Sequence, residues 1–199
     1  MAKFITALLT TVTMFMVVLA QPEPDNPTCS QGNKKTVHDC CKMPSIGEQA
    51  VLNRCMAENP KPKTPPTPGT KKTEGCCVAQ CMLTSVNAFT NNAIDKDAVK
   101  RALKTTVGAD PNFAPLVDGI VEQCHNSVSS NAALKATPVP ATPGRAGCSF
   151  LPEAFVNCVG STFVQKCPTA AWTNNDDCNQ LKEKLASGCS LASLKQIEM

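Results

Sequence analysis

Thirteen cysteines constrain the fold of this 199-residue chain more than any other feature of its sequence. They are Cys29, Cys40, Cys41, Cys55, Cys76, Cys77, Cys81, Cys124, Cys148, Cys158, Cys167, Cys178 and Cys189. In an oxidising compartment, cysteines in this number form disulfides that hold distant parts of a chain together. Because thirteen is odd, the sequence predicts at most six bridges within one chain and one cysteine outside them.

Zinc binding is the other common use of clustered cysteines. Zinc sites favour reduced thiols in C-x2-C pairs, often together with histidine. This chain has no C-x2-C pair and only two histidines, so we expect neither a metal site nor a cofactor.

The first twenty residues have the pattern of a signal peptide. Lys3 precedes an uncharged apolar run, and Ala20 supplies a small residue at the expected cleavage position. A membrane anchor needs about 20 strongly apolar residues, whereas this run is shorter and holds four threonines. We therefore expect residues 1–20 to be removed, residues 21–199 to form a single secreted domain, and no later stretch to insert stably in a membrane.

Charge and aromatic content exclude several partners. The 19 basic and 16 acidic residues are mixed along the chain, and no clustered basic face suggests a nucleic acid. The chain has no tyrosine and a single tryptophan, Trp172, so recognition of sugars or bases by stacking is not expected.

Apolar residues recur at helical spacing through most of the chain. A capping box at Ser45 and Glu48 predicts the first helix, with Met56 facing inward, and Asp95 and Asp110 are candidate starts of two later helices. We find no convincing alternating strand, and the N-terminal segment 21–44 is expected to be irregular. The predicted fold is all-α, a compact bundle of about six or seven helices stapled by disulfides. The expected helices span residues 45–58, 76–89, 95–108, 110–124, 152–166 and 176–187, and proline-rich loops span 60–75 and 131–147.

Two histidines are the candidates for catalysis. His38-Asp39 precedes Cys40-Cys41, which suggests the dyad of secreted phospholipases, but the order is reversed and no glycine-rich calcium loop is present. His125 follows Cys124 beside polar neighbours, and a bridged cysteine is not a nucleophile. We therefore predict a protein that is not an enzyme, with no catalytic residues.

The cysteine spacing resembles that of the insect odorant-binding proteins. The marks are C-x3-C in one helix, C-x8-C later in the chain, and a proline directly after the last of these cysteines, which is similar to the Plus-C subgroup. The residues that carry the pattern are Cys77, Cys81, Cys124, Cys148, Cys158, Cys167, Pro168, Cys178 and Cys189.

The resemblance implies a set of bridges between cysteines. The family pairs its first cysteine with the third, the second with the fifth and the fourth with the sixth. This implies Cys55–Cys81, Cys77–Cys158 and Cys124–Cys167, with Cys41 competing with Cys55 for the first position. The other cysteines would supply up to three more bridges, and adjacent cysteines should have different partners because a bridge between neighbours is strained.

The resemblance also implies a function. The protein would carry odorant-like or pheromone-like apolar molecules in an internal pocket and deliver them through sensory lymph to an odorant receptor, as a monomer or a homodimer. A secreted disulfide-rich inhibitor or defence protein, using the loop at 60–75, is the alternative. The candidate pocket residues lie on the inward stripes of the helices, where simple packing of these residues on one another is the competing interpretation. They are Met82, Val86, Phe89, Leu103, Phe113, Leu116, Ile120, Phe155, Val159 and Phe163.

Overall fold

The computed structural model describes residues 27–32, 35–60, 74–136, 138–139, 147–187, 189, 191 and 194. The expected signal peptide lies outside these residues, and so do residues 61–73 of the first proline-rich loop. The described part is mainly helical, which confirms the all-α prediction. Its α-helices are α1 (Pro27–Ser30), α2 (Val37–Cys40), α3 (Gln49–Glu58), α4 (Glu74–Ser85), α5 (Lys96–Thr106), α6 (Val117–Ser129), α7 (Ala132–Ala136), α8 (Phe150–Gln165) and α9 (Asp176–Ala186).

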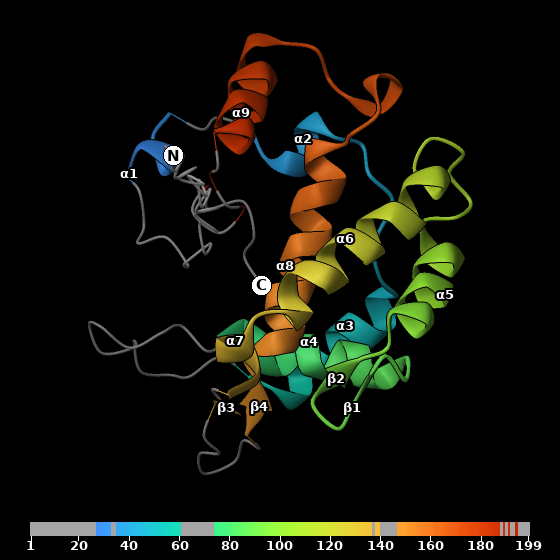
Figure 1. Cartoon of the computed structure of the whole chain (residues 1–199). Coiled ribbons are helices and arrows are strands. Elements are labelled where there is room, and N and C mark those ends of the chain that lie inside the picture. The colour runs from blue at the N-terminus through green and yellow to red at the C-terminus, as the bar shows by residue number, and fades with distance from the viewer. Residues whose placement is uncertain are drawn as a thin grey trace, which may run out of the picture.

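Helix α8 is the centre of the arrangement. It runs lengthwise through the molecule and is contacted by α4, α6, α7 and α9 (Figure 1). Phe155 and Phe163 of α8 are almost fully buried, as are Phe113 and Ile120 from the α6 side. The rings of Phe113 and Phe163 lie 6.4 Å apart, within the range of favourable aromatic contact. This packing forms the largest apolar cluster of the described residues.

Three helices begin at side-chain caps, of which Asp95 was predicted from the sequence. Asp95 caps α5 by accepting from the N–H groups of Asp97 and Ala98. Ser149 caps α8 and Asn175 caps α9 in the same manner. Each of these side chains satisfies a backbone donor that the first helical turn leaves without a partner.

The first predicted helix begins later than expected. The hydroxyl of Ser45 donates to the carbonyl oxygen of Gly47, so it does not cap a helix, and Glu48 is the residue before α3. Met56 faces outward, with 41% of its surface exposed. The predicted capping box and the inward position of Met56 were therefore wrong.

The helix expected from Asp110 is also delayed. The Asp110 carboxylate accepts from the N–H of Asn112 in a turn, a 3-10 turn (η1) follows at Ala114–Leu116, and α6 begins at Val117. Pro115 has no N–H to donate, which favours this irregular entry over a regular helix.

The helix expected over 76–89 ends early, at Ser85. Asn87 adopts a left-handed backbone (φ 55°), and the N–H of Ala88 donates to the carbonyl oxygen of Leu83 at 2.8 Å. This arrangement ends a helix by satisfying its last carbonyl groups. Phe89 consequently lies in a strand.

Two short hairpins correct the expectation that the chain has no strands. β1 (Phe89–Thr90) pairs with β2 (Ala93–Ile94) through a two-residue turn, in which Asn91 and Asn92 have φ values of 51° and 56°. Asparagine tolerates this left-handed backbone better than most residues do. β3 (Pro138–Val139) pairs with β4 (Cys148–Ser149), so part of the loop expected at 131–147 is ordered by α7 and β3. Strands of two residues are too short to show alternation in a sequence.

Six disulfides form, as the odd number of cysteines predicts, and they fall into two groups. The inner group joins Cys55 to Cys81, Cys77 to Cys148 and Cys124 to Cys158, and it links α3 to α4, α4 to β4, and α6 to α8. The outer group ties the N-terminal segment to the C-terminal segment. Its bridges are Cys29–Cys189, Cys40–Cys178 and Cys41–Cys167.

The inner bridges correct two of the three implied pairs. Cys55–Cys81 forms as implied, but Cys77 pairs with Cys148 instead of Cys158, and Cys124 pairs with Cys158 instead of Cys167. The interlocked order itself is kept, with Cys148 as the fifth cysteine and Cys158 as the sixth. The C-x8-C spacing of Cys158 and Cys167 was misleading. The fifth and sixth cysteines of the pattern are Cys148 and Cys158, which have nine residues between them and bond to Cys77 and Cys124.

Backbone pairing explains why Cys167 joins the outer group. The N–H of Lys42 donates to the carbonyl oxygen of Ala171, and the N–H of Thr173 donates to that of Cys40. These bonds draw the chain after α2 alongside the chain after α8, next to Cys167. Cys40 and Cys41 consequently reach different partners, as predicted for adjacent cysteines.

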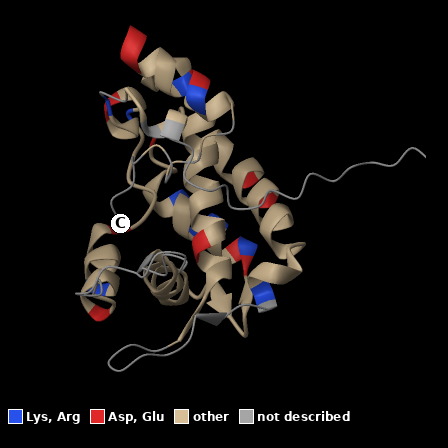
Figure 2. Ribbon diagram, turned by 90° about the vertical axis from the view of Figure 1, so that its left-hand side faces the viewer, with Lys and Arg blue, Asp and Glu red and all other residues tan. Residues whose placement is uncertain are grey.

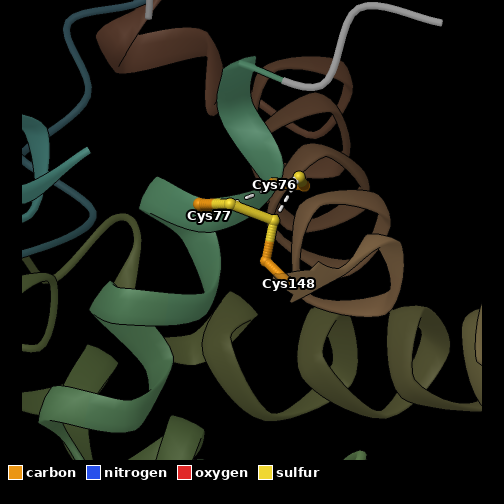
Figure 3. A group of neighbouring side chains, drawn as sticks. All are labelled: Cys76, Cys77 and Cys148. Carbon is orange, nitrogen blue, oxygen red and sulfur yellow. Dashed lines mark hydrogen bonds between the residues drawn. A yellow bond between two sulfur atoms is a disulfide. The ribbon is translucent and has the colours of Figure 1, made fainter. Parts of the chain in front are cut away.

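Cys76 is the cysteine outside the six disulfides, and it is buried. Its Sγ lies 2.8 Å from Sγ of Cys148 and 3.9 Å from Sγ of Cys77, so three sulfur atoms meet at the start of α4 (Figure 3). Both Cys76 and Cys77 are therefore within reach of Cys148.

Replacing Cys77 with Ser should move the bridge by one residue. Because Cys76 already contacts Cys148, we expect a Cys76–Cys148 disulfide in the Cys77→Ser variant. Alkylation in denaturant without reductant, followed by mass spectrometry, should show no modified thiol in this variant and one in the wild type.

Cys148→Ser is the matched control. It leaves Cys76 and Cys77 as adjacent residues that bridge poorly, and two alkylated thiols are expected. Two alkylated thiols in the Cys77→Ser variant as well would show that Cys76 is held away from Cys148.

Candidate functional site

An apolar cavity of about 600 Å³ lies between five helices and the segment that precedes α3. Its walls come mainly from α3, α4, α5 and α8, with α2 at one edge, and Leu191 contributes to the lining. The apolar lining residues are Val37, Met43, Pro44, Ile46, Val51, Leu52, Met82, Leu83, Val86, Ala98, Val99, Ala102, Leu103, Phe155, Val156, Val159, Val164 and Leu191.

Half of the predicted pocket residues line this cavity. The residues that the structure brings together there are Met82, Val86, Leu103, Phe155 and Val159. The remaining five lie elsewhere: Phe89, Phe113, Leu116, Ile120 and Phe163. Of these, Phe113, Ile120 and Phe163 have no exposed surface and pack on one another's helices, which is the competing interpretation given for them from the sequence.

Phe89 faces a second, smaller hollow of about 400 Å³. This hollow lies beside β4, and polar side chains such as Gln80, Asn92 and Lys135 contribute to its lining. Apolar ligands fit the larger cavity better, because its lining is mostly aliphatic and aromatic.

The segment before α3 is the part of the site that sequence reasoning missed. Met43 and Ile46 line the cavity although they lie outside any helix. A Cβ atom at Gly47 would lie 3.3 Å from Cε of Met82, so glycine permits the close approach of this segment to α4. The available signal was the pair of apolar residues in a stretch otherwise rich in proline, serine and glycine.

His38 and Asp39 lie in α2, which corrects the prediction of an irregular segment. The Asp39 carboxylate accepts from both the N–H and the hydroxyl of Thr36, each at 2.8 Å. These hydrogen bonds lower the pKa of Asp39 below its ordinary value. Asp39 therefore caps the helical turn, and His38 lies exposed at the edge of the cavity.

His125 offers no nucleophilic pair either. It is half-buried on α6, and its Nδ1 is buried without a hydrogen-bond partner among the described residues. The adjacent Cys124 is bonded to Cys158 and is not a thiol. The three sulfurs around Cys76 are likewise a poor zinc site, because two of them are bonded to each other.

Charges of both signs are interspersed along the helices (Figure 2). Between α5 and α6, Lys96 and Lys100 pair with Glu122, and Lys104 pairs with Asp118. Among the helices that the structure describes, none combines the length and the apolar character needed to cross a membrane.

Glu153 is the titratable group that burial perturbs most. It is half-buried near the start of α8, one turn before the cavity-lining Asn157, and it forms no ion pair with a described residue. Burial raises the pKa of its carboxyl from 4.5 to about 7. This carboxyl therefore titrates near neutral pH.

Comparisons with known proteins agree with this architecture. The family model described as AgamOBP47-like matches residues 44–184. General odorant-binding protein 67 of Anopheles gambiae is 34% identical over 182 residues, which cover 90% of this chain and 87% of that protein. Odorant-binding protein 47 and general odorant-binding protein 68 of the same mosquito are 27% and 24% identical, over 74% and 90% of this chain and 67% and 83% of their own lengths.

The chain therefore belongs to the AgamOBP47-like family of odorant-binding proteins, which confirms the resemblance read from its cysteines. The three outer disulfides and Pro168 fit the Plus-C subgroup.

Replacing Glu153 with Gln should flatten part of the pH dependence of stability. The folded state keeps the Glu153 proton up to about pH 7, whereas the unfolded chain loses it near pH 4.5, so stability falls as the pH rises between these values. By urea unfolding, the wild type should have a lower free energy of unfolding at pH 8 than at pH 5. Glu153→Gln should reduce this difference by about 1–3 kcal/mol.

The exposed Glu183 of α9 provides a control, because Glu183→Gln should keep the wild-type pH dependence. An unchanged pH dependence in Glu153→Gln would mean that this carboxyl is hydrated in both states.

Proposed function

We propose that this chain is a secreted carrier that binds small apolar molecules in the cavity between α3, α4, α5 and α8. The observation that carries the proposal is a cavity of about 600 Å³ with a largely apolar wall. Pockets for small molecules typically measure about 300–1,000 Å³. Membership in a family whose named relatives are odorant-binding proteins supports the same function.

Burial of the ligand accounts for its affinity. A ligand that buries roughly 300 Å² of apolar surface gains roughly 7–8 kcal/mol. Loss of its translational and rotational freedom offsets part of this gain. Because a micromolar dissociation constant corresponds to about 8 kcal/mol, the carrier should bind such ligands at micromolar or weaker affinity and release them readily.

The disulfides support a cavity that stays open. In an ordinary protein core, side chains move to fill an empty space, because atoms that line it lose dispersion contacts. Here α3 is bonded to α4 by Cys55–Cys81, and α8 is bonded to α6 by Cys124–Cys158. These bridges fix α3 on α4 and α8 on α6, which limits how far these walls of the cavity can move.

The same proposal includes secretion, delivery and the absence of catalysis. Disulfides persist in oxidising compartments outside the cytosol, and the expected signal peptide at residues 1–20 would direct the chain there. Ligand would then be delivered through sensory lymph to an odorant receptor. His38, the histidine at the cavity, makes no hydrogen bond to a serine or cysteine of the described residues, and Asp39 accepts hydrogen bonds from Thr36.

A tryptophan at Val86 should block the cavity. Val86 is half-buried and lines the cavity directly after the end of α4, so the larger side chain should enter the cavity while the surrounding core stays intact. We expect the Val86→Trp variant to remain folded by circular dichroism and to lose at least tenfold in affinity for the fluorescent probe N-phenyl-naphthylamine.

Thr84→Trp places the same side chain on an exposed position of α4, and this variant should bind the probe like the wild type. Failure of the wild type to bind the probe at any concentration up to the probe's solubility limit would refute the carrier proposal. Equal binding by Val86→Trp would show that the probe binds elsewhere.

A further inference from the structure

Among the described residues, α8 contributes one polar side chain to the wall of the cavity, that of Asn157. Asn157 lines the wall together with Val156, Gly160 and Val164. These residues recur three and four positions apart, so they form one face of the helix. Asn157 is half-buried, and its side-chain amide makes no hydrogen bond with any residue that the structure describes.

The other polar residues of the lining differ from Asn157 in exposure or in bonding. Those exposed at the edge of the cavity are His38, Ser45, Glu48, Gln49, Arg101 and Thr105. Thr106 is half-buried, but its hydroxyl donates to the carbonyl oxygen of Leu103 at 3.3 Å. Among the described lining residues, Asn157 is therefore the half-buried polar side chain whose hydrogen-bonding groups are left for a ligand or water.

An asparagine is not required at this position for the helix or for packing. Asparagine is a poorer helix former than leucine or alanine, and its neighbours on this face are aliphatic or glycine. A partly buried amide without a partner is unfavourable. A ligand oxygen would remove this penalty.

We propose that Asn157 determines the ligand class by hydrogen bonding to a neutral oxygen at one end of an otherwise apolar molecule. An amide both donates and accepts, so alcohols, aldehydes and ketones fit, whereas pure hydrocarbons leave the amide without a partner. An anionic head group would instead favour Arg101, which is exposed to water. The inference rests on the proposed carrier function.

Competition against N-phenyl-naphthylamine tests the inference with octanol and octene, which share the same chain length. A hydrogen bond of ordinary strength corresponds to a preference of about three- to tenfold. Wild-type protein should therefore prefer octanol by about this factor. In Asn157→Leu this preference should vanish, and because both competitors are measured against the same probe in the same variant, a change in probe affinity does not affect the comparison.

Two further variants make the result unambiguous. Asn126→Leu makes the same change on an exposed position of α6 outside the cavity, and it should keep the wild-type preference. Asn157→Ala replaces the amide with a small, strongly helix-forming residue. It should also lose the preference for octanol, so it tests the same point if the bulkier leucine disturbs folding.

The outcomes separate the inference from the carrier proposal. Equal affinities for octanol and octene in the wild type, or an unchanged preference in both Asn157 variants, would overturn the role of Asn157 while the carrier function stands. Stronger binding of octanoate than of octanol, abolished by Arg101→Gln but not by Asn157→Leu, would overturn it in favour of an anionic ligand. Binding of neither probe nor octanol nor octene would overturn the carrier function itself.

Discussion

The interlocked inner bridges are the constraint on which the rest of this structure depends. Cys77–Cys148 anchors the start of α4 beside the start of α8, Cys55–Cys81 attaches α3 to α4, and Cys124–Cys158 attaches α6 to α8. Each bridge restricts the unfolded chain and contributes about 2–4 kcal/mol. These bridges set how α3, α4, α6 and α8 pack, and a cavity of about 600 Å³ lies beside the core that α4, α5 and α8 share.

Local signals in the sequence predicted the helices better than their ends. Asp95 caps α5 as expected because its carboxylate reaches two backbone N–H groups within its own turn. The end of α4 was missed because the left-handed conformation of Asn87 depends on the hairpin that follows, which apolar periodicity does not reveal. The bridges show the same limit. The spacing of Cys158 from Cys148 and from Cys167 allows it to be either the sixth or the fifth cysteine of the family pattern. The packing of α6 on α8 places it beside Cys124, its partner.

The lining of the cavity was predictable where it lies on helices. Met82, Leu103 and Val159 were found by their helical spacing, but spacing does not separate a residue that lines a cavity from one that packs in a core, and Phe113 and Phe163 proved to be core. Met43 and Ile46 escaped prediction because a non-helical segment has no periodicity to read. The outer bridge Cys41–Cys167 holds this segment near the end of α8, so the cysteines added to the common six also shape the cavity wall.

Nuclear magnetic resonance of isotope-labelled methionine methyl groups tests the central claim most directly, because the chain carries its own reporters. Met43 and Met82 line the cavity, whereas Met56 is exposed on α3 and does not contribute to the lining. On titration with octanol, the methyl signals of Met43 and Met82 should shift together and saturate at the same ligand concentration, while the signal of Met56 stays in place. Saturable binding that leaves Met43 and Met82 unshifted, or that shifts Met56 instead, would contradict the account.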